Sequence, residues 1–296
     1  MYNCPDMSAD MQSITRIAVI TYPGVPGAIE EMNQVTEVLG KHGFQVSQGM
    51  LNDDSLRKRV QDQEFDLLIA LGGDGTMLRA GHLCGPVDVP ILGINLGRFG
   101  FLTEVQQNKW QQSIDRLLSD DYWIEKRMML RAEAWRSDEL LGDWIVLNEV
   151  VVTRGSLVRP VQLIARVDGR YLTTYVADGL IAATPTGSTA YALAAGGPIL
   201  PPDLRNILLV AVAPHLSLDR AIILAEGSTV NIEVSSEYQA VLSPDGQEPI
   251  ELINGDRVEV YADEHTVQFL RFQDPGYFYR NITPHMSNNP STGNHR

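Results

Sequence analysis

The amino-acid sequence predicts an α/β domain in the first half of the chain and a mainly β domain in the second half. Short apolar runs alternate with longer amphipathic runs as far as Leu118, and strand-like runs follow one another closely after Trp123. The chain has 296 residues, which exceeds the ~100–200 residues of a usual single domain. We therefore expect a first domain over residues 14–122 and a second over 123–273.

The first half has the pattern of a parallel sheet covered by helices, which is a Rossmann-like arrangement. Its strand candidates are rich in Val, Ile, Leu or Phe and end near Gly, Pro or Asp: Ile17–Tyr22, Phe44–Ser47, Leu67–Leu71 and Ile91–Ile94. Helices are expected in the intervals, at Ile29–His42, Leu56–Gln61 and Thr76–Leu83.

The second half reads mainly as strands joined by short turns. Val161–Val167 and Tyr171–Val176 flank Asp168-Gly169, which is a strong β-hairpin signal. A helical run is expected at Thr189–Ala195, and the polar tail Ser287–Arg296 is expected to be disordered. The other strand candidates are Trp123–Trp135, Asp143–Thr153, Ile207–Ala213, Val230–Val234, Gln239–Leu242, Arg257–Ala262 and Val267–Phe272.

Charge and cysteine content exclude several classes of function. With 23 Lys and Arg against 37 Asp and Glu, the formal net charge is −14, so nucleic acid is not an expected partner. Cys4 and Cys84 provide neither a disulfide framework nor a Cys-His zinc cluster, which fits a reducing compartment. The apolar runs are far shorter than the ~18–20 residues of a membrane span. We expect a cytoplasmic protein without a membrane partner.

A glycine-rich loop follows the strand candidate Leu67–Leu71 directly. In Gly72-Gly73-Asp74-Gly75-Thr76, glycines allow backbone amides to approach an anion, and the next helix directs its N-terminal amides to the same point. The loop matches neither the P-loop nor the dinucleotide fingerprint. A carboxylate such as that of Asp74 suits a phosphate site if it accepts a proton from an attacking hydroxyl or holds Mg²⁺. An Asp-Gly pair is also typical of a tight turn or a helix N-cap.

Three further segments combine polar residues with glycine or with strand ends. Gly93–Leu102 follows the next strand and is either part of the same ligand site or an ordinary connection. Asp178–Tyr191 runs from a strand into a Ser- and Thr-rich loop, which can cap a helix or contact a nucleotide. Asn148-Glu149 interrupts an apolar strand, at a water-facing edge or beside a ligand. Asp245-Gly246-Gln247 by itself predicts a turn.

Together these segments resemble the NAD kinase family, the bacterial ATP-NAD kinases, from about Ile17 to Gln247. The Thr-Pro-Thr-Gly-Ser-Thr-Ala-Tyr block at 184–191 is the most specific, because other kinase families share the Gly-Gly-Asp-Gly loop. The family's other motifs stand at 72–76, 93–102, 148–149, 178–198, 214–218 and 245–247. In this family the C-terminal segment, here 274–296, returns to the first domain.

The resemblance implies an enzyme that transfers a phosphoryl group from ATP to NAD and yields NADP. Asp74 would remove the proton from the 2′-hydroxyl of the adenosine ribose, while the loop and Mg²⁺ position the donor phosphates; no residue is expected as a dedicated metal ligand. The implied nucleotide-binding residues are Gly72, Gly73, Asp74, Gly75, Thr76, Arg79, Asn148, Glu149, Arg159, Val176, Asp178, Thr189, Ala190, Tyr191, Ala192, Leu193, Ala194 and Gln247.

Some properties stay open at this stage. Arg79 and Arg159 could equally be solvated surface charges. Val176 stands where some relatives carry a basic residue, which leaves the preference between NAD and NADH undecided. The family forms homodimers or homotetramers, and the sequence does not choose between them or say whether polyphosphate replaces ATP.

Two other functions compete with this interpretation. A lipid kinase would share the Gly-Gly-Asp-Gly loop, but the acidic balance and the lack of a basic amphipathic segment argue against membrane docking. A dinucleotide sensor without catalysis would retain the pocket, but a carboxylate beside bound phosphates is costly unless it has a catalytic task.

Overall fold

The chain divides into two structural units that differ from the expected domains at their boundaries. The structure, a computed structural model, describes residues 13–97, 100–157, 159–215 and 218–287. The first unit contains the described residues up to 126 and from 267 onward, and the second contains those of 127–266. Residues 267–273, expected in the second domain, therefore belong to the first unit together with the described part of 274–296.

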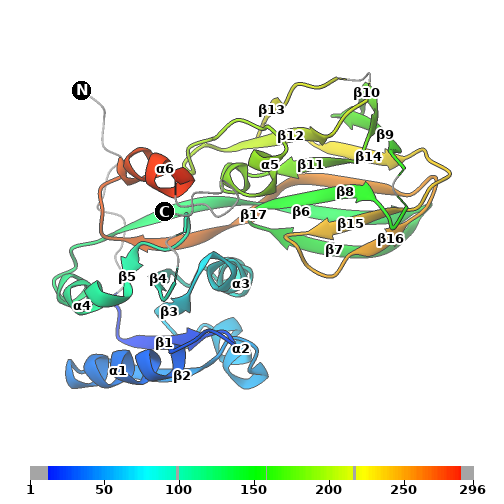
Figure 1. The fold of residues 1–296 in the computed structure, drawn as a ribbon. Helices are drawn as coiled ribbons and strands as arrows, with labels where there is room; N and C mark the ends of the chain where they lie inside the picture. The colour runs from blue at the N-terminus through cyan, green and yellow to red at the C-terminus, as the bar shows by residue number, and fades with distance from the viewer. Residues whose placement is uncertain (1–12, 98–99, 158, 216–217, 288–296) are drawn as a thin grey trace. The chain divides into compact units, whose positions relative to one another are not determined.

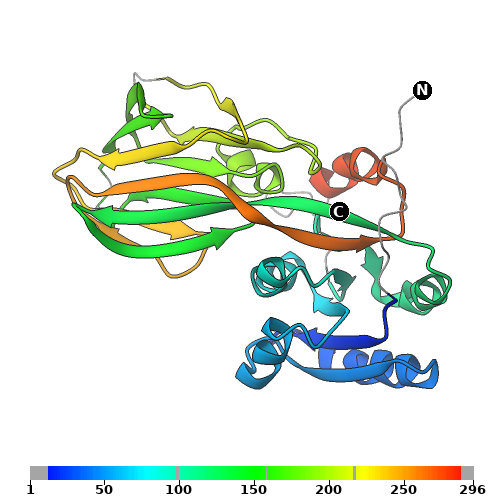
Figure 2. The same cartoon turned by 180° about the vertical axis from the view of Figure 1, so that it is seen from behind.

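The first unit is built on a parallel sheet with the strand order β17-β4-β3-β1-β2, in which β5 also pairs with β4. Helix α1 packs along β1 and β2, as both views show (Figures 1 and 2). The elements of this unit are β1 (Arg16–Thr21), α1 (Ala28–Lys41), β2 (Gln45–Met50), α2 (Asp54–Gln61), β3 (Leu67–Gly72), α3 (Asp74–Cys84), β4 (Ile91–Asn95), β5 (Val105–Gln106), α4 (Trp110–Leu118), the start of β6 (Trp123–Arg136), α6 (Tyr277–Ser287) and the end of β17 (Arg257–Arg271).

Local sequence explains these elements. All residues of β3 are buried, as expected for an apolar strand with a neighbour on each side. Helix α2 begins after Asp53, whose side chain accepts hydrogen bonds from the backbone amides of Ser55 and Leu56. The apolar faces of α1 and α4 join the strands in one core, with Leu39, Trp110 and the strand residues between them buried. This core fixes the position of the loop that follows β3.

The second unit is made of antiparallel strand pairs. One sheet has the order β13-β12-β11-β8-β15-β16, and β10, β9, β14 and β17 are neighbours in the other. Its elements are the end of β6 (Trp123–Arg136), β7 (Glu139–Val146), β8 (Glu149–Arg154), β9 (Val161–Val167), β10 (Arg170–Ala177), β11 (Gly179–Ala183), α5 (Tyr191–Ala194), β12 (Asn206–Val212), β13 (Ile222–Ala225), β14 (Val230–Val234), β15 (Ala240–Pro244), β16 (Ile250–Leu252) and most of β17.

The inward-facing side chains of both sheets form the core of the second unit. Along β9 and β14 they alternate with partly exposed residues, as antiparallel strands with one buried face require. The Asp168-Gly169 hairpin joins β9 to β10, and both residues have positive φ (51° and 75°), as the expected turn demands.

The fold class expected from the sequence is confirmed: an α/β unit precedes a mainly β unit. Two strand assignments were wrong. The run Asp143–Thr153 is broken at Leu147-Asn148 into β7 and β8, and the two strands expected at 257–262 and 267–272 are one strand, β17. The polar residues 263–266, which lie between the two expected strands, continue the strand. Residues 288–296, in the tail expected to be disordered, lie outside the described residues.

The short strands β5, β13 and β16 and the helices α4 and α6 were not expected. Within the described ranges, no helix is both long and apolar enough to cross a membrane.

Candidate active site

The Gly-Gly-Asp-Gly-Thr loop lies where β3 ends and α3 begins. Gly72 closes the strand, Gly73 is the N-cap residue, and Asp74 is the first residue of α3. A Cβ atom on Gly72 would lie 2.3 Å from Oγ1 of the buried Thr76, so this position admits only glycine without rearrangement. Exposed Gly75 follows in the first turn. The free amides and positive dipole end of α3 therefore stand directly after a strand end, which suits an anion.

Asp74 is held by a second glycine-containing segment. Its Oδ2 accepts a hydrogen bond from the backbone N–H of Phe101 (2.8 Å), and Oδ1 accepts one from that of Leu102 (3.0 Å). A Cβ atom on Gly100 would lie 2.0 Å from Oδ1, so glycine is needed for this approach. Each carboxylate oxygen has a second lone pair. The carboxylate is fixed in direction and still able to accept a proton.

Arg79 lies one helical turn after the loop. Its Nη1 donates to the carbonyl oxygen of Gly75 (3.0 Å), and its guanidinium stacks over the ring of Tyr22 at 4.3 Å. The side chain is exposed but oriented by these two contacts, so a cation is directed to the start of α3.

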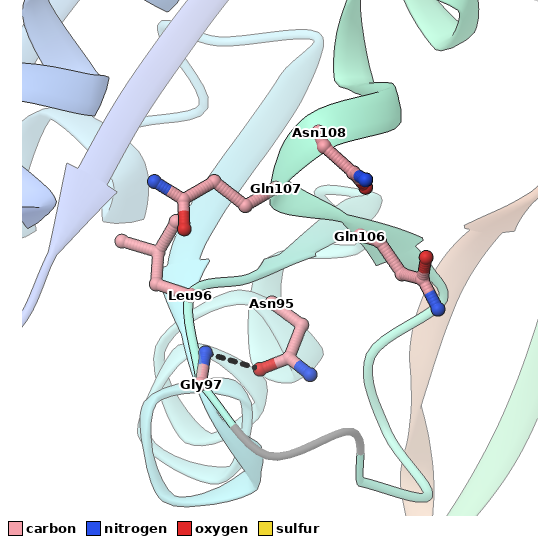
Figure 3. A pocket seen from close by; sticks show the side chains of 6 residues that line it. All are labelled: Asn95, Leu96, Gly97, Gln106, Gln107 and Asn108. Atoms are coloured by element: carbon pink, nitrogen blue, oxygen red, sulfur yellow. Dashed lines mark hydrogen bonds between the residues drawn. The ribbon is translucent and has the colours of Figure 1, made fainter.

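A pocket of about 330 Å³ opens at the carboxyl end of β4, and Gly72 pairs with Asn95 in the same sheet. Oδ1 of Asn95 accepts a hydrogen bond from Gly97 N–H (3.0 Å), as the dashed line in Figure 3 marks. Glu31 on α1 accepts a hydrogen bond from Gln107. Side-chain amides both donate and accept, so they suit a base or a sugar. The pocket is lined by Asn95, Leu96, Gly97, Gln106, Gln107 and Asn108.

In the second unit, Asn148 lies in the connection between β7 and β8, and Glu149 is the first residue of β8. The carboxylate of Asp245 accepts three backbone hydrogen bonds there: from Leu147 (2.6 Å), Asn148 (2.9 Å) and Glu149 (2.8 Å). The N–H of Asp245 donates to the carbonyl oxygen of Glu149 (2.9 Å). This buried carboxylate, which lies just after β15, fixes the backbone that carries the Asn-Glu pair.

The Thr- and Ser-rich segment packs against the same connection. Thr184 donates from its N–H to Asn148 O (2.8 Å) and from its hydroxyl to Leu147 O (2.6 Å). A Cβ atom on Gly187 would lie 2.1 Å from Asn148 O, so the approach requires glycine. The hydroxyl of Ser188 accepts from Leu200 N–H (2.9 Å) and donates to Pro185 O (2.6 Å). These hydroxyls are used for internal structure.

The residues that follow differ in exposure. Thr189 donates to Thr186 O (3.1 Å), Ala190 precedes the short helix α5, and Tyr191 is 44% exposed. In the rest of α5, Ala192 is buried, Leu193 is partly exposed and Ala194 is exposed. Gln247 is exposed in the turn after Asp245, where its N–H donates to Pro244 O (2.9 Å).

Glu149 is the residue whose protonation is most altered by this environment. The side chain is buried, and burial raises its pKa to about 8; the nearby charge of Asp245 adds to the rise, and the backbone amide of Tyr191 opposes it. Within the described part of the chain, Oε2 of Glu149 has no hydrogen-bond partner. A buried acceptor without a partner beside a glycine- and hydroxyl-rich segment is a candidate ligand contact.

The structure does not bring Asp178, Val176 and Arg159 next to Glu149. In the pairing of β11 with β8, Ala183 faces Glu149 and Gly179 faces Thr153, so the end that carries Asp178 is about 13 Å farther along the strand. Asp178 forms an ion pair with Arg154 (3.2 Å), and Val176 is exposed on β10. Arg159 is exposed, with its guanidinium 6.0 Å from the ring of Tyr238.

Comparison with known families identifies both units. Residues 17–122 match the model of the ATP-NAD kinase N-terminal domain, and residues 147–272 match that of the ATP-NAD kinase C-terminal domain. The chain belongs to the NAD kinase family. An NAD kinase of Chloroflexus aggregans is 38% identical over 91% of this chain and 97% of its own length. One from Citrifermentans bemidjiense is 42% identical over 73% of this chain and 75% of its own length.

Solved structures of NAD kinase relatives have the same fold. Yeast NADH kinase complexed with NADH aligns with a TM-score of 0.81 and 26% identity, covering 94% of this chain and 89% of its own. An NAD kinase from Archaeoglobus fulgidus in complex with ATP aligns with a TM-score of 0.73 and 25% identity, covering 92% and 99%. The family expected from the sequence motifs is therefore confirmed.

Sequence reasoning missed several residues that shape this NAD kinase family site. Asp245 was assigned to a turn, and it does have the positive φ of a turn residue (47°), but its carboxylate also organises three backbone amides. The amides of Phe101 and Leu102 were missed because backbone donors leave no side-chain signal. Arg271, in the strand expected at 267–272, gave no signal that it is buried.

Proposed function

We propose that this chain phosphorylates the 2′-hydroxyl of the adenosine ribose of NAD with ATP as the donor, and that Asp74 is the general base. The observation that carries this proposal is the fixation of Asp74 at the start of α3, with both carboxylate oxygens held by backbone amides. A carboxylate held in one direction beside an anion-binding helix end is suited to accept the proton of an attacking hydroxyl. Membership of the NAD kinase family supports the choice of acceptor and donor.

Besides a proton acceptor, the reaction needs only groups that bind and orient the donor phosphates. Asp74 takes the proton of the 2′-hydroxyl as the ribose oxygen bonds to the γ-phosphorus, and the bond from that phosphorus to the β,γ-bridging oxygen breaks to release ADP. The amide of Gly75 at the start of α3 binds the donor phosphates, and Arg79 adds a positive charge there. The pocket beside Asn95 is available to the rest of the donor nucleotide.

Mg²⁺ fits this site as an ion carried by the donor. Among the described residues, no three His, Cys, Asp or Glu side chains gather in a manner that could hold a metal ion. Mg²⁺ usually keeps several waters and binds largely through substrate phosphates in kinase sites, so ATP would carry the ion without a dedicated protein ligand. The ion would neutralise charge on the transferred phosphoryl group.

For NAD we propose contacts in the second unit. Glu149 and Asn148 are held by Asp245 and by Thr184, and the unpaired Oε2 of Glu149 supports a hydrogen bond to a ribose hydroxyl. Tyr191 exposes a ring that can stack on a base. Asp178 at the other end of β11, Val176 on β10 and Arg159 would contact a more distant part of the same extended dinucleotide. Gln247 and residues 189–194 complete the set.

We also propose that the enzyme acts in the cytoplasm as a homodimer or homotetramer. The acidic charge balance and the two-cysteine composition support the first statement, and family membership supports the second.

The test is an assay of NADP formation from NAD, ATP and Mg²⁺, followed with an NADP-dependent dehydrogenase. Asp74→Asn keeps the shape of the side chain but cannot accept the proton, so turnover should fall by ~10²–10⁴ while NAD still binds. Unchanged turnover in Asp74→Asn would remove this residue from the mechanism. A folded wild-type protein that binds NAD and forms no NADP would instead be a dinucleotide sensor.

A further inference from the structure

The first unit contains a buried ionic cluster that the proposed chemistry does not use. Arg271 at the end of β17 is 1% exposed, and its Nε donates to Oε2 of Glu125 (2.9 Å). Glu104 lies 4.0 Å from the same guanidinium, and the hydroxyl of Tyr277 donates to Oε1 of Glu125 (2.8 Å). Burial disfavours the charged form of Arg271, but Glu125, Tyr277 and Glu104 more than compensate and raise its pKa. The guanidinium is therefore a permanent cation.

The cluster reaches the catalytic carboxylate through a single residue. Nη1 of Arg271 donates to the carbonyl oxygen of Leu102 (3.1 Å), and the N–H of Leu102 donates to Oδ1 of Asp74 (3.0 Å). Leu102 is itself buried, so water does not compete for either contact. A shift of the Arg271 side chain would move the backbone that orients Asp74.

A contribution to the free energy of unfolding does not readily explain why this cluster is buried. The cost of removing buried charges from water often exceeds what their attraction returns, and the best-attested use of buried ionic groups is to specify one geometry. The guanidinium is held by hydrogen bonds to Glu125 and Leu102 and by the rings of Phe269 and Tyr277, whose centres lie 4.9 Å and 5.2 Å from its carbon. Its planar fork serves both hydrogen-bond acceptors from two nitrogens in a fixed geometry, whereas a lysine would have to reach both from one ammonium nitrogen.

We propose that Arg271 is a positioning residue for the phosphoryl transfer, which acts on Asp74 through the Leu102 backbone. This inference rests on the proposed role of Asp74 as the base. Arg271 is buried and so is not exposed to a substrate, and its replacement should therefore lower kcat and leave the KM for NAD nearly unchanged.

The experiment measures kcat and KM for wild type, Asp74→Asn, Arg271→Lys and the double variant. Arg271→Lys keeps the buried cation but loses the fork, and we expect kcat to fall ~10–100-fold with KM for NAD changed less than about threefold. Because Arg271 acts through Asp74, Asp74→Asn should cost correspondingly less in the Arg271→Lys background than in wild type. Multiplicative losses, or an unchanged kcat in Arg271→Lys, would overturn the inference.

A matched control separates positioning from general loss of stability. Arg16→Lys changes another Arg-carboxylate pair of the same unit, in which Arg16 Nε lies 3.2 Å from Asp66 Oδ1, and should leave kcat within about twofold. If Arg271→Lys does not fold, Tyr277→Phe removes one support of Glu125 and should lower kcat about two- to fivefold. An unchanged kcat in Tyr277→Phe would then overturn the inference.

These variants distinguish a wrong role for Asp74 from a wrong role for Arg271. No loss in Asp74→Asn removes the base and, with it, the role of Arg271. A loss in Asp74→Asn together with a wild-type kcat in Arg271→Lys retains the base and refutes only the positioning.

Discussion

Replacing Glu149 by glutamine should remove a pH-dependent loss of stability. Burial first, and the charge of Asp245 second, raise the pKa of Glu149 in the folded protein to about 8 from a reference value of 4.5. Between these two values the folded state binds a proton that the unfolded state has released. The free energy of unfolding of the wild type therefore falls as the pH rises from about 4.5 to 8, and no longer changes through this group above that range.

The size of the effect follows from the two pKa values. Integrated between pH 6 and pH 9, the linkage relation gives a loss of about 2–3 kcal/mol in the free energy of unfolding from this one carboxyl. Glutamine has nearly the same shape and does not titrate, so Glu149→Gln should lack this slope. The difference in unfolding free energy between variant and wild type should therefore shift by the same amount in favour of the variant.

The assay is urea denaturation followed by tryptophan fluorescence at pH 6, 7, 8 and 9, with wild type and Glu149→Gln measured in parallel. Glu37→Gln is the control, because Glu37 is exposed in the other unit and its pKa is lowered by Lys41. Its difference from wild type should stay constant over this range. Parallel pH profiles for wild type and Glu149→Gln would refute the assignment of a buried, proton-holding carboxyl at this position.

Two further substitutions test the backbone contacts that hold the polar groups. In Gly100→Ala the new Cβ would lie 2.0 Å from Oδ1 of Asp74, so NADP formation should fall ~10²-fold or more; Gly40→Ala, where a Cβ meets nothing within 4 Å, should retain wild-type turnover. Asp245→Ala leaves three backbone amides without their acceptor and should lower the free energy of unfolding by about 2–4 kcal/mol and weaken NAD binding in calorimetry. Unaltered NAD affinity in folded Asp245→Ala would show that the Asn148-Glu149 pair does not need this support.

Many of the helices and strands could be predicted from the sequence because the patterns that indicate them are local. The ends of the expected strand Leu67–Leu71 and the expected helix Ile29–His42 lie within one residue of those of β3 and α1. In each segment the spacing of apolar residues fits a single type of element, and the residues at its ends mark where it stops. Where local and tertiary signals conflict, the prediction failed. Asn148 and Glu149 stand in an apolar run whose pattern predicts one strand. Their backbone N–H groups instead donate to the carboxylate of Asp245, nearly a hundred residues away in sequence.

The sequence could point to those parts of the candidate site that consist of unusual side chains. Asp74 and Glu149 are unusual residues in their local settings, and both prove to be held in defined positions. Arg271 and the Phe101 and Leu102 amides could not be found in this way, because their roles exist only once segments far apart in sequence are in contact. A buried arginine in a strand looks, in sequence, like an exposed one.

The pairing of Phe269 on β17 with Ile91 on β4 has a consequence for the order of events during synthesis. The first unit is assembled from two separate stretches of chain, and all of residues 127–266 leave the ribosome between them. At ~5–20 residues per second this takes on the order of 10–30 s. During that interval β4 has no β17 to pair with at Ile91. Glu104 and Glu125 likewise lack their contacts with the guanidinium of Arg271. The unit proposed to carry the catalytic base can therefore be completed only after the other unit has been translated.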